Sequence, residues 1–217
     1  IIALLQLVGI LMKSTSNLAM VNIEIQEAKI AFNRMFEFAT IKKEAQGEIT
    51  INNFESLMLE NVSFRFSGRD QLLKNINVEI KKGQFISIVG ESGSGKSTLG
   101  QILQKFYIQE NGAITINDSI SLNDVQLSSW RSLIAVIPQD INIFNGTVVD
   151  NLLLGNEDSP EQVIQFCKEY GFEKFITQLP QGYGTIIGEE GVNLSGGQKQ
   201  IIAFARALYR RPHFLIL

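Results

Sequence analysis

The chain has 217 residues, of which 45% are hydrophobic and 19% are charged, and its formal net charge is −3. This is the composition of a globular protein with room for one sizeable domain and an appendage. The slightly acidic balance excludes a basic footprint for nucleic acid, so we expect no nucleic-acid partner. The single cysteine, Cys167, excludes an intramolecular disulfide.

Residues 1–12 are almost wholly apolar, and this run stops at Lys13. A membrane-spanning helix needs about 20 such residues, and the stretch lacks the basic leader and the cleavage site of a signal peptide. We therefore expect the chain to begin inside a longer apolar helix. Residues 18–41 have a mixed, amphipathic helical pattern. They form either a helix packed on its own domain or the cytosolic extension of a membrane helix.

The polar segment 42–53, which contains Gly47, is interpreted as a linker. Beyond it, apolar and polar residues alternate around Val62, Phe64 and Phe66, and they alternate again from residue 76 to residue 80. A period of two predicts a half-buried strand in each place.

Residues 90–98 fit G-x-x-x-x-G-K-[ST], the pattern of a loop that wraps the phosphates of a nucleoside triphosphate. Its glycines let backbone N–H groups turn inward on an anion. Lys96 would place its charge on the β- and γ-phosphates, and Ser97 would place its hydroxyl on Mg²⁺. The apolar run 85–89 predicts a buried strand before the loop, and the spacing after it predicts a helix whose N-terminus favours phosphate. The predicted phosphate-binding residues are Gly90, Glu91, Ser92, Gly93, Ser94, Gly95, Lys96, Ser97 and Thr98.

Further elements follow in chain order. Short apolar runs predict strands at 113–116 and at 133–137, the second ending at Pro138 and Gln139. Ser159 and Pro160 are typical of a helix start, and Gly171 ends that helix. Residues 194–198 open another helix that runs to about residue 210, and the apolar run 214–217 predicts the start of a buried strand.

Three of these features together resemble the nucleotide-binding domain of ABC transporters. They are the phosphate loop, Gln139, and the signature formed by Leu194, Ser195, Gly196, Gly197 and Gln198. The resemblance implies an α/β fold: a P-loop ATPase core with an antiparallel β subdomain and a helical signature subdomain, preceded by the end of a transmembrane helix. It assigns residues 1–41 to the end of the last transmembrane helix and its cytosolic extension, 42–53 to the linker and 54–217 to the nucleotide-binding domain.

The same resemblance implies that two such domains sandwich ATP head to tail, with the phosphate loop of one subunit facing the signature of the other. It implies that Phe66 stacks on adenine; the alternative is an inward strand residue. It implies that Gln139 reaches Mg²⁺ and the attacking water, on a loop that contacts the membrane domain. Glu189, in the exporter-like segment 185–191, is expected to touch the coupling helices, unless Glu189 and Glu190 are merely solvated loop charges.

Some positions depart from the family pattern. Asp is frequent where Gly184 stands, and Arg is frequent where Ile201 stands. Residues 214–217 resemble the apolar half of the Walker B strand, after which an Asp for Mg²⁺ and the catalytic Glu are expected. His213 precedes that strand and is not the switch histidine. We therefore expect a C-terminally truncated piece that binds ATP weakly or not at all and does not hydrolyse it alone.

The resemblance implies an ATP-driven exporter in a membrane, with ATP and Mg²⁺ as cofactors. ATP binding would dimerise the nucleotide-binding domains, as a homodimer in preference to a heterodimer, and hydrolysis would reset them. The other partners would be the coupling helices of a membrane domain; segment 143–148 is also exporter-like. The alternative is a soluble ABC-type ATPase acting on nucleic acid or ribosomes, against which segments 1–12 and 185–191 argue. Peptide, lipid and drug cargoes stay open, with the lead-in helix and linker slightly favouring peptide or bacteriocin export.

Overall fold

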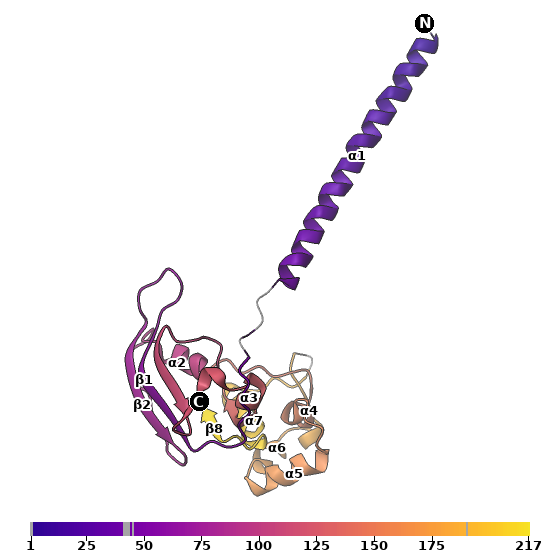
Figure 1. Ribbon diagram of the computed structural model, residues 1–217. Helices are drawn as coiled ribbons and strands as arrows, with labels where there is room; N and C mark the ends of the chain where they lie inside the picture. Colours follow the sequence, from indigo (N-terminus) through magenta and orange to yellow (C-terminus); the bar gives the residue numbers. More distant parts are fainter. Residues whose placement is uncertain (1, 41–43, 45, 190) are drawn as a thin grey trace. The chain divides into compact units, whose positions relative to one another are not determined.

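The computed structural model describes residues 2–40, 44, 46–189 and 191–217, and the chain divides into two units, residues 1–44 and residues 45–217. The described residues of the first unit include α1 (Ile2–Ala39), a continuous helix of 38 residues (Figure 1). The apolar and the amphipathic stretches of the sequence therefore share one helix. Within the described part of the chain, no helix combines the length and the apolarity that a membrane span requires.

Residues 46–51, which we call the strap, belong to the second unit although they lie inside the predicted linker. The Ile49 N–H donates to the Asp124 carbonyl at 2.9 Å, and the Gln126 N–H donates to the Ile49 carbonyl at 2.7 Å. Gly47 lies so close to Asp124 that a Cβ would overlap the Asp124 backbone. Segment 42–53 is therefore not a free linker along its whole length. Residues 42, 43 and 45 lie outside the described residues.

A four-stranded antiparallel sheet follows the strap, in the order β2-β1-β3-β4. Its strands are β1 (Ser56–Phe64), β2 (Leu73–Lys81), β3 (Asn111–Ile116) and β4 (Ile120–Ser121). Alternation of apolar and polar residues buries one face of β1, including Leu57, Leu59 and Val62. The antiparallel β subdomain expected from the sequence is confirmed.

The run 85–89 does not form the predicted buried strand. It has no regular secondary structure, and its residues are exposed, with Phe85 at 102% and Val89 at 86% of full exposure. A strand needs a neighbour for its backbone N–H and C=O groups. Among the described residues, no strand pairs with this run. The prediction failed because strand propensity is a property of the segment, whereas a strand requires a partner.

The helix after the phosphate loop is α2 (Lys96–Leu103), as predicted. Beyond it lie the 3-10 helix η1 (Leu122–Asp124), α3 (Leu127–Leu133) and β5 (Ile134–Val136). β5 pairs in parallel with β8 (Phe214–Ile216), the last strand of the described chain. The Trp130 indole N–H donates to the Leu103 carbonyl at 2.6 Å, which joins α3 to the end of α2.

The remaining elements form a mainly helical part, in which α4, α5 and α6 lie together (Figure 1). They are β6 (Gly146–Thr147), α4 (Val148–Leu153), α5 (Pro160–Glu169), α6 (Glu173–Ile176), the 3-10 helix η2 (Gly182–Gly184), β7 (Ile186–Ile187) and α7 (Gly196–Tyr209). α7 packs against α4 and α5 and also against β5. It therefore joins the helical part to the parallel strands.

Two clusters of buried side chains match these two parts. One cluster fills the space between the antiparallel sheet, α2 and α3, and the other lies among α4, α5, α6 and α7. The sequence-based expectation of an α/β core with a β subdomain and a helical signature subdomain is confirmed.

Candidate nucleotide-binding site

The phosphate loop, residues 90–95, runs directly into the first turn of α2. Gly95 is the N-cap residue of α2 and has φ +91°, and Gly93 has φ +82°. Both values lie in the left-handed region that glycine adopts at no steric cost. A Cβ on Gly95 would also come within 2.7 Å of the Leu73 side chain. The backbone path therefore favours glycine at both positions, and at Gly95 the Leu73 side chain of β2 leaves little room for a Cβ.

The Lys96 ammonium lies inside this loop. It donates to the carbonyl oxygens of Gly90 and Glu91, at 2.9 and 2.7 Å, and to the Ser94 hydroxyl at 3.4 Å. All three acceptors are neutral, so these contacts leave the cation without a compensating negative charge. A polyphosphate would supply that charge, while the helix N-terminus would add a favourable dipole. The geometry suits an anionic ligand placed between the loop and α2.

Gln139 lies just after the end of β5, where its side chain is exposed. The parallel pairing continues one residue past β5, since the Ile137 N–H donates to the Ile216 carbonyl at 2.9 Å. The β8 strand also approaches the phosphate-loop helix, because a Cβ on Gly100 of α2 would lie 3.7 Å from the Ile216 side chain. The loop that carries Gln139 therefore emerges from strands that adjoin α2.

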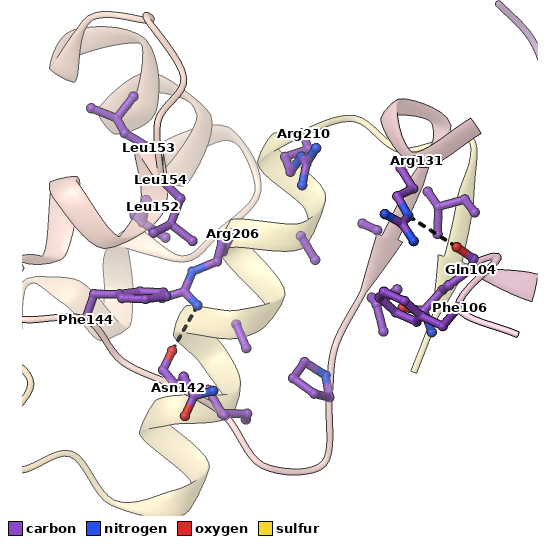
Figure 2. A pocket seen from close by; sticks show the side chains of 17 residues that line it. Gln104, Phe106, Arg131, Asn142, Phe144, Leu152, Leu153, Leu154, Arg206 and Arg210 are labelled. Carbon is purple, nitrogen blue, oxygen red and sulfur yellow. Dashed lines mark hydrogen bonds between the residues drawn. The ribbon is translucent and has the colours of Figure 1, made fainter. Parts of the chain in front are cut away.

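A groove of about 420 Å³ opens beside this loop (Figure 2). Its wall carries three arginines, Arg131, Arg206 and Arg210, and two aromatic rings, Phe106 and Phe144. The guanidinium of Arg131 lies 4.7 Å from the centre of the Phe106 ring. Among the described residues that line the groove, none is Asp or Glu. The groove therefore combines apolar walls with positive charge.

The signature residues form the start of α7. Ser195 is the N-cap residue: its hydroxyl accepts from the Gln198 N–H at 3.3 Å, and the Ser195 N–H donates to the Gln198 side-chain oxygen at 2.9 Å. This capping box fixes where the helix begins. Leu194 is buried and anchors the turn. A Cβ on Gly196 or Gly197 would meet no described atom within 4 Å. The helix N-terminus thus presents an open, glycine-lined face to the outside.

The two exporter-like segments lie against each other. β6 pairs antiparallel with β7, joining Gly146 to Ile187, and a Cβ on Gly188 would overlap the Asn145 side chain. The Glu189 N–H donates to the Asn145 side-chain oxygen at 2.6 Å, and the Glu189 residue is exposed. Glu190 lies outside the described residues.

Phe66 lies just beyond β1 in a cluster of three aromatic rings. It meets Phe64 and Tyr107 edge-on, with ring centres 5.0 and 5.3 Å apart. Phe66 is half-buried and packs against the core, whereas Tyr107 is exposed. The predicted adenine-stacking residue is therefore held in place by neighbouring aromatic rings.

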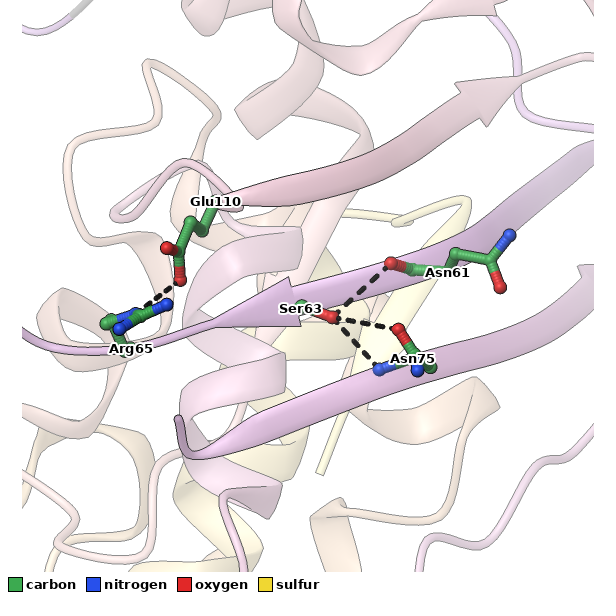
Figure 3. Close-up of polar contacts among 5 residues, drawn as sticks. All are labelled: Asn61, Ser63, Arg65, Asn75 and Glu110. Carbon is green, nitrogen blue, oxygen red and sulfur yellow. Dashed lines mark hydrogen bonds and ion pairs between the residues drawn. The ribbon is translucent and has the colours of Figure 1, made fainter. Parts of the chain in front are cut away.

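The pairing of β1, the strand that leads to Phe66, is interrupted by register shifts. Asn61 and Asn75 have φ of 50° and 49°, and the pairing of β1 with β2 and β3 shifts register between residues 59 and 64. The buried Ser63 hydroxyl accepts from the Asn75 N–H at 3.0 Å (Figure 3). The Arg65 guanidinium donates to the Glu110 carboxylate at 2.7 Å, which raises the pKa of Arg65. These contacts fix the direction in which the chain leaves the sheet.

The donors available for a metal ion are few. Among the described residues, no group of three or more His, Cys, Asp or Glu side chains could hold a metal. Ser97, in the first turn of α2, has an exposed hydroxyl, and Gln139 has an exposed amide. Two neutral oxygens fit Mg²⁺ only when phosphate oxygens and water complete its shell, as is usual for Mg²⁺ bound with a nucleotide.

The family model described as "ABC transporter" matches residues 73–217. The chain belongs to the ABC transporter family. A solved structure described as a bacterial Atm1-family ABC exporter with ATP bound has a TM-score of 0.76 and 34% identity to this chain. The match covers 88% of this chain and 34% of that one. The sequence and the fold are therefore those of a nucleotide-binding domain of exporter-type ABC transporters.

Relatives within the family are longer proteins. The chain is 37% identical over 214 residues to the ATP-dependent lipid A-core flippase of Pasteurella multocida, which covers 95% of this chain and 36% of the flippase. It is 38% identical over 223 residues to the alpha-hemolysin translocation ATP-binding protein of Proteus vulgaris, which covers 100% of this chain and 31% of that protein. The chain thus spans about a third of the length of these relatives. Both matches include most or all of α1.

Sequence reasoning missed the polar groups beneath the groove. Arg206 and Asn151 were not singled out, although Asn151 is 1% exposed. A signal was present for Arg206, since it lies one helical turn beyond the buried Ile202 and Ala203, within the apolar stripe of α7. A charge in a buried stripe indicates a specific partner.

Proposed function

We propose that the chain is the ATP-binding domain of an ATP-driven membrane exporter. One observation carries the proposal: a single chain combines a phosphate loop, in which the described acceptors of the Lys96 ammonium are all neutral oxygens, with a capped signature helix whose glycine face is open. The first feature suits the phosphates of a nucleotide bound by this chain. The second suits a phosphate that approaches from outside it.

Titration with a fluorescent ATP analogue tests this proposal. We expect saturable, weak binding that falls at least tenfold in Lys96→Ala, because the substitution removes the charge that faces the phosphates. The matched control is Lys74→Ala, which removes a lysine from the exposed side of β2. Equal affinity of wild type and Lys96→Ala for the analogue would contradict the proposal.

Mg²⁺ would be held with the nucleotide by Ser97 and Gln139. The ion would neutralise charge on the phosphates and so assist transfer of the terminal phosphoryl group to water. Lys96 would orient the phosphates, and the loop glycines would allow backbone N–H groups to approach them. In the whole protein, Gln139 would also orient the attacking water.

A second nucleotide-binding domain would complete the site. The N-terminus of α7 has two glycines with no described neighbour on the side-chain face, so another molecule's phosphate could approach its N–H groups. Head-to-tail pairing of two copies would bring the signature of each to the phosphate loop of the other. ATP would then lie between the domains, and hydrolysis would separate them.

The membrane domain would contact the groove beside Gln139 and the exposed Glu189. The groove supports this because its apolar walls and its three arginines suit a segment that carries both apolar and acidic side chains. β6 and β7 hold Glu189 near the end of segment 143–148, so both exporter-like segments would face the same partner.

Location in a membrane is supported by the relatives, whose matches extend over α1 and which are named as a flippase and a translocation protein. These names favour an exporter over the soluble alternative. They also differ in cargo at nearly equal identity to this chain, lipid A-core in one and alpha-hemolysin in the other. The preference for a peptide or bacteriocin cargo therefore stays a prediction.

A further inference from the structure

A cluster of polar groups beneath the groove joins the loop after Gln139 to α4 and α7. The Arg206 guanidinium donates through Nη1 to the Asn142 carbonyl at 3.0 Å and through Nε to the Asn151 carbonyl at 2.9 Å. Its Nη2 donates to the Asn151 side-chain oxygen at 3.1 Å. The guanidinium carbon lies 5.5 Å from the centre of the Phe144 ring, and the two side chains lie beside each other in Figure 2. We call Arg206 and Asn151 the latch.

Asn151 gives the latch its second half. Its side-chain oxygen accepts from the Phe144 N–H at 2.9 Å, and its amide donates to the carbonyls of Phe144 and Thr147 at 2.8 and 3.0 Å. The side chain therefore pairs with both backbone groups of Phe144, as a neighbouring strand would. Because Asn151 is buried, losing one of these partners would leave a polar group without a hydrogen bond inside the protein.

The position of the latch along the chain suggests what it does. Asn142 follows Gln139 by three residues, and Arg206 lies on α7, the helix that Ser195 caps. A 14-residue helix is stiff, so a shift imposed at Arg206 would move the whole of α7. The latch thus joins the segment that follows Gln139 to the helix that begins at the signature.

The chemistry of Arg206 fits a positioning role better than a simple filling of space. Its hydrogen bonds end on neutral oxygens, and burial lowers its pKa, so keeping the cation here costs free energy. The planar guanidinium donates in three fixed directions at once, to two different segments. A lysine has one nitrogen and cannot reproduce that geometry.

We infer that Arg206 is a positioning residue for the nucleotide reaction, through which a nucleotide-dependent shift of the Gln139 loop reaches the signature helix. This inference rests on the proposed function, since it assumes that Gln139 responds to bound MgATP. It adds a residue that touches neither nucleotide nor metal and acts through Asn142 and Asn151.

Hydrogen–deuterium exchange of the full chain, with and without saturating MgATP, tests the latch. The variants are Arg206→Gln and Arg206→Lys, and Arg210→Gln is the control because Arg210 lines the same groove from the exposed end of the same helix. Without nucleotide, we expect the Phe144 amide to exchange about tenfold faster in Arg206→Gln. With MgATP, we expect slower exchange at residues 196–202 in the wild type and in Arg210→Gln, and no such change in the two Arg206 variants. MgATP affinity should stay within threefold of the wild type in all of them.

The outcomes separate the latch from the proposed function. MgATP-dependent protection of residues 196–202 in Arg206→Lys equal to that of the wild type would overturn the latch while leaving ATP binding intact. If Arg210→Gln lost the MgATP-dependent protection of residues 196–202 as fully as the Arg206 variants, the latch would also be overturned. The protection would then depend on the positive charge of the groove and not on the hydrogen bonds of Arg206. ATP binding that does not depend on Lys96 would overturn the proposed function and the latch with it. Should Arg206→Gln not fold, as judged by Trp130 fluorescence, Arg206→Lys carries the test.

Discussion

Gly47→Ala tests whether the strap is fixed by backbone contacts. A Cβ at residue 47 would overlap backbone atoms of Asp124, which cannot rotate away as the end of a side chain could. The strap would have to detach. The backbone hydrogen bonds at 2.9 and 2.7 Å between the strap and residues 124–126 would then be lost, and Ile51, now 6% exposed, would be uncovered.

The magnitude follows from these contacts. Each backbone hydrogen bond contributes about 0.5–1.5 kcal/mol, and burial of an isoleucine side chain contributes about 1.5–3 kcal/mol. The freed residues regain conformational entropy, which offsets part of this loss. We therefore expect Gly47→Ala to lower the free energy of unfolding by about 1–3 kcal/mol.

Urea unfolding followed by tryptophan fluorescence measures this change, because Trp130 is the chain's one tryptophan and is buried. The centre of its ring lies 6.4 Å from that of Phe54, a residue that follows the strap in sequence. The control is Gly184→Ala, where a Cβ would meet no described atom within 4 Å. An unfolding free energy for Gly47→Ala within about 0.5 kcal/mol of the wild type, together with unchanged exchange of the Ile49 amide, would refute the reasoning.

Three further predictions concern single groups. Burial raises the pKa of the Cys167 thiol to about 11, so a thiol reagent at pH 8 should modify it only in unfolded chain; rapid labelling of the native chain would contradict this. Hydrogen bonds from Thr147 hold the pKa of Asp150 below its ordinary 3.8, so its contribution to stability is complete above that pH and is lost as pH falls through the lower, folded-state value. Asp150→Asn should therefore weaken the acid dependence of the urea midpoint, and an unchanged acid profile would contradict a stabilising role for the hydrogen bonds between Asp150 and Thr147, the N-cap residue of α4. Trp130→Phe leaves the Leu103 carbonyl without its donor and should lower the free energy of unfolding, measured with heat or urea, by about 1–3 kcal/mol. An unchanged free energy of unfolding would mean that a water molecule takes the place of the indole N–H.

The features that local chemistry determines could be predicted from the sequence. Gly93 and Gly95 of the phosphate loop have the left-handed backbone that favours glycine, and Ser195 caps α7 through its own side chain. The alternation of apolar and polar residues predicted β1 and β2, because a period of two can be recognised within a few consecutive residues. In each case the residues that decide the structure are neighbours in the chain.

The features that were missed depend on distant partners. The run 85–89 has strand-forming residues, but no described strand lies beside it. The polar composition of the strap predicts a linker, yet its backbone forms hydrogen bonds with residues 124–126. Amino-acid composition does not predict such backbone hydrogen bonds. Asn151 and Arg206 meet across 55 residues of sequence. Such pairs become visible only once the helices are packed.

The two-residue pairing of β6 with β7 has a consequence for exchanging parts between family members. Only glycine fits at position 188, because a Cβ there would overlap Asn145, and the Glu189 N–H donates to the side-chain oxygen of the same asparagine. A graft that replaces segment 185–191 alone would therefore set a foreign loop against an unmatched Asn145. Functional chimeras should tolerate the exchange of segments 143–148 and 185–191 together far better than the exchange of either segment alone, because β6 and β7 pair with each other.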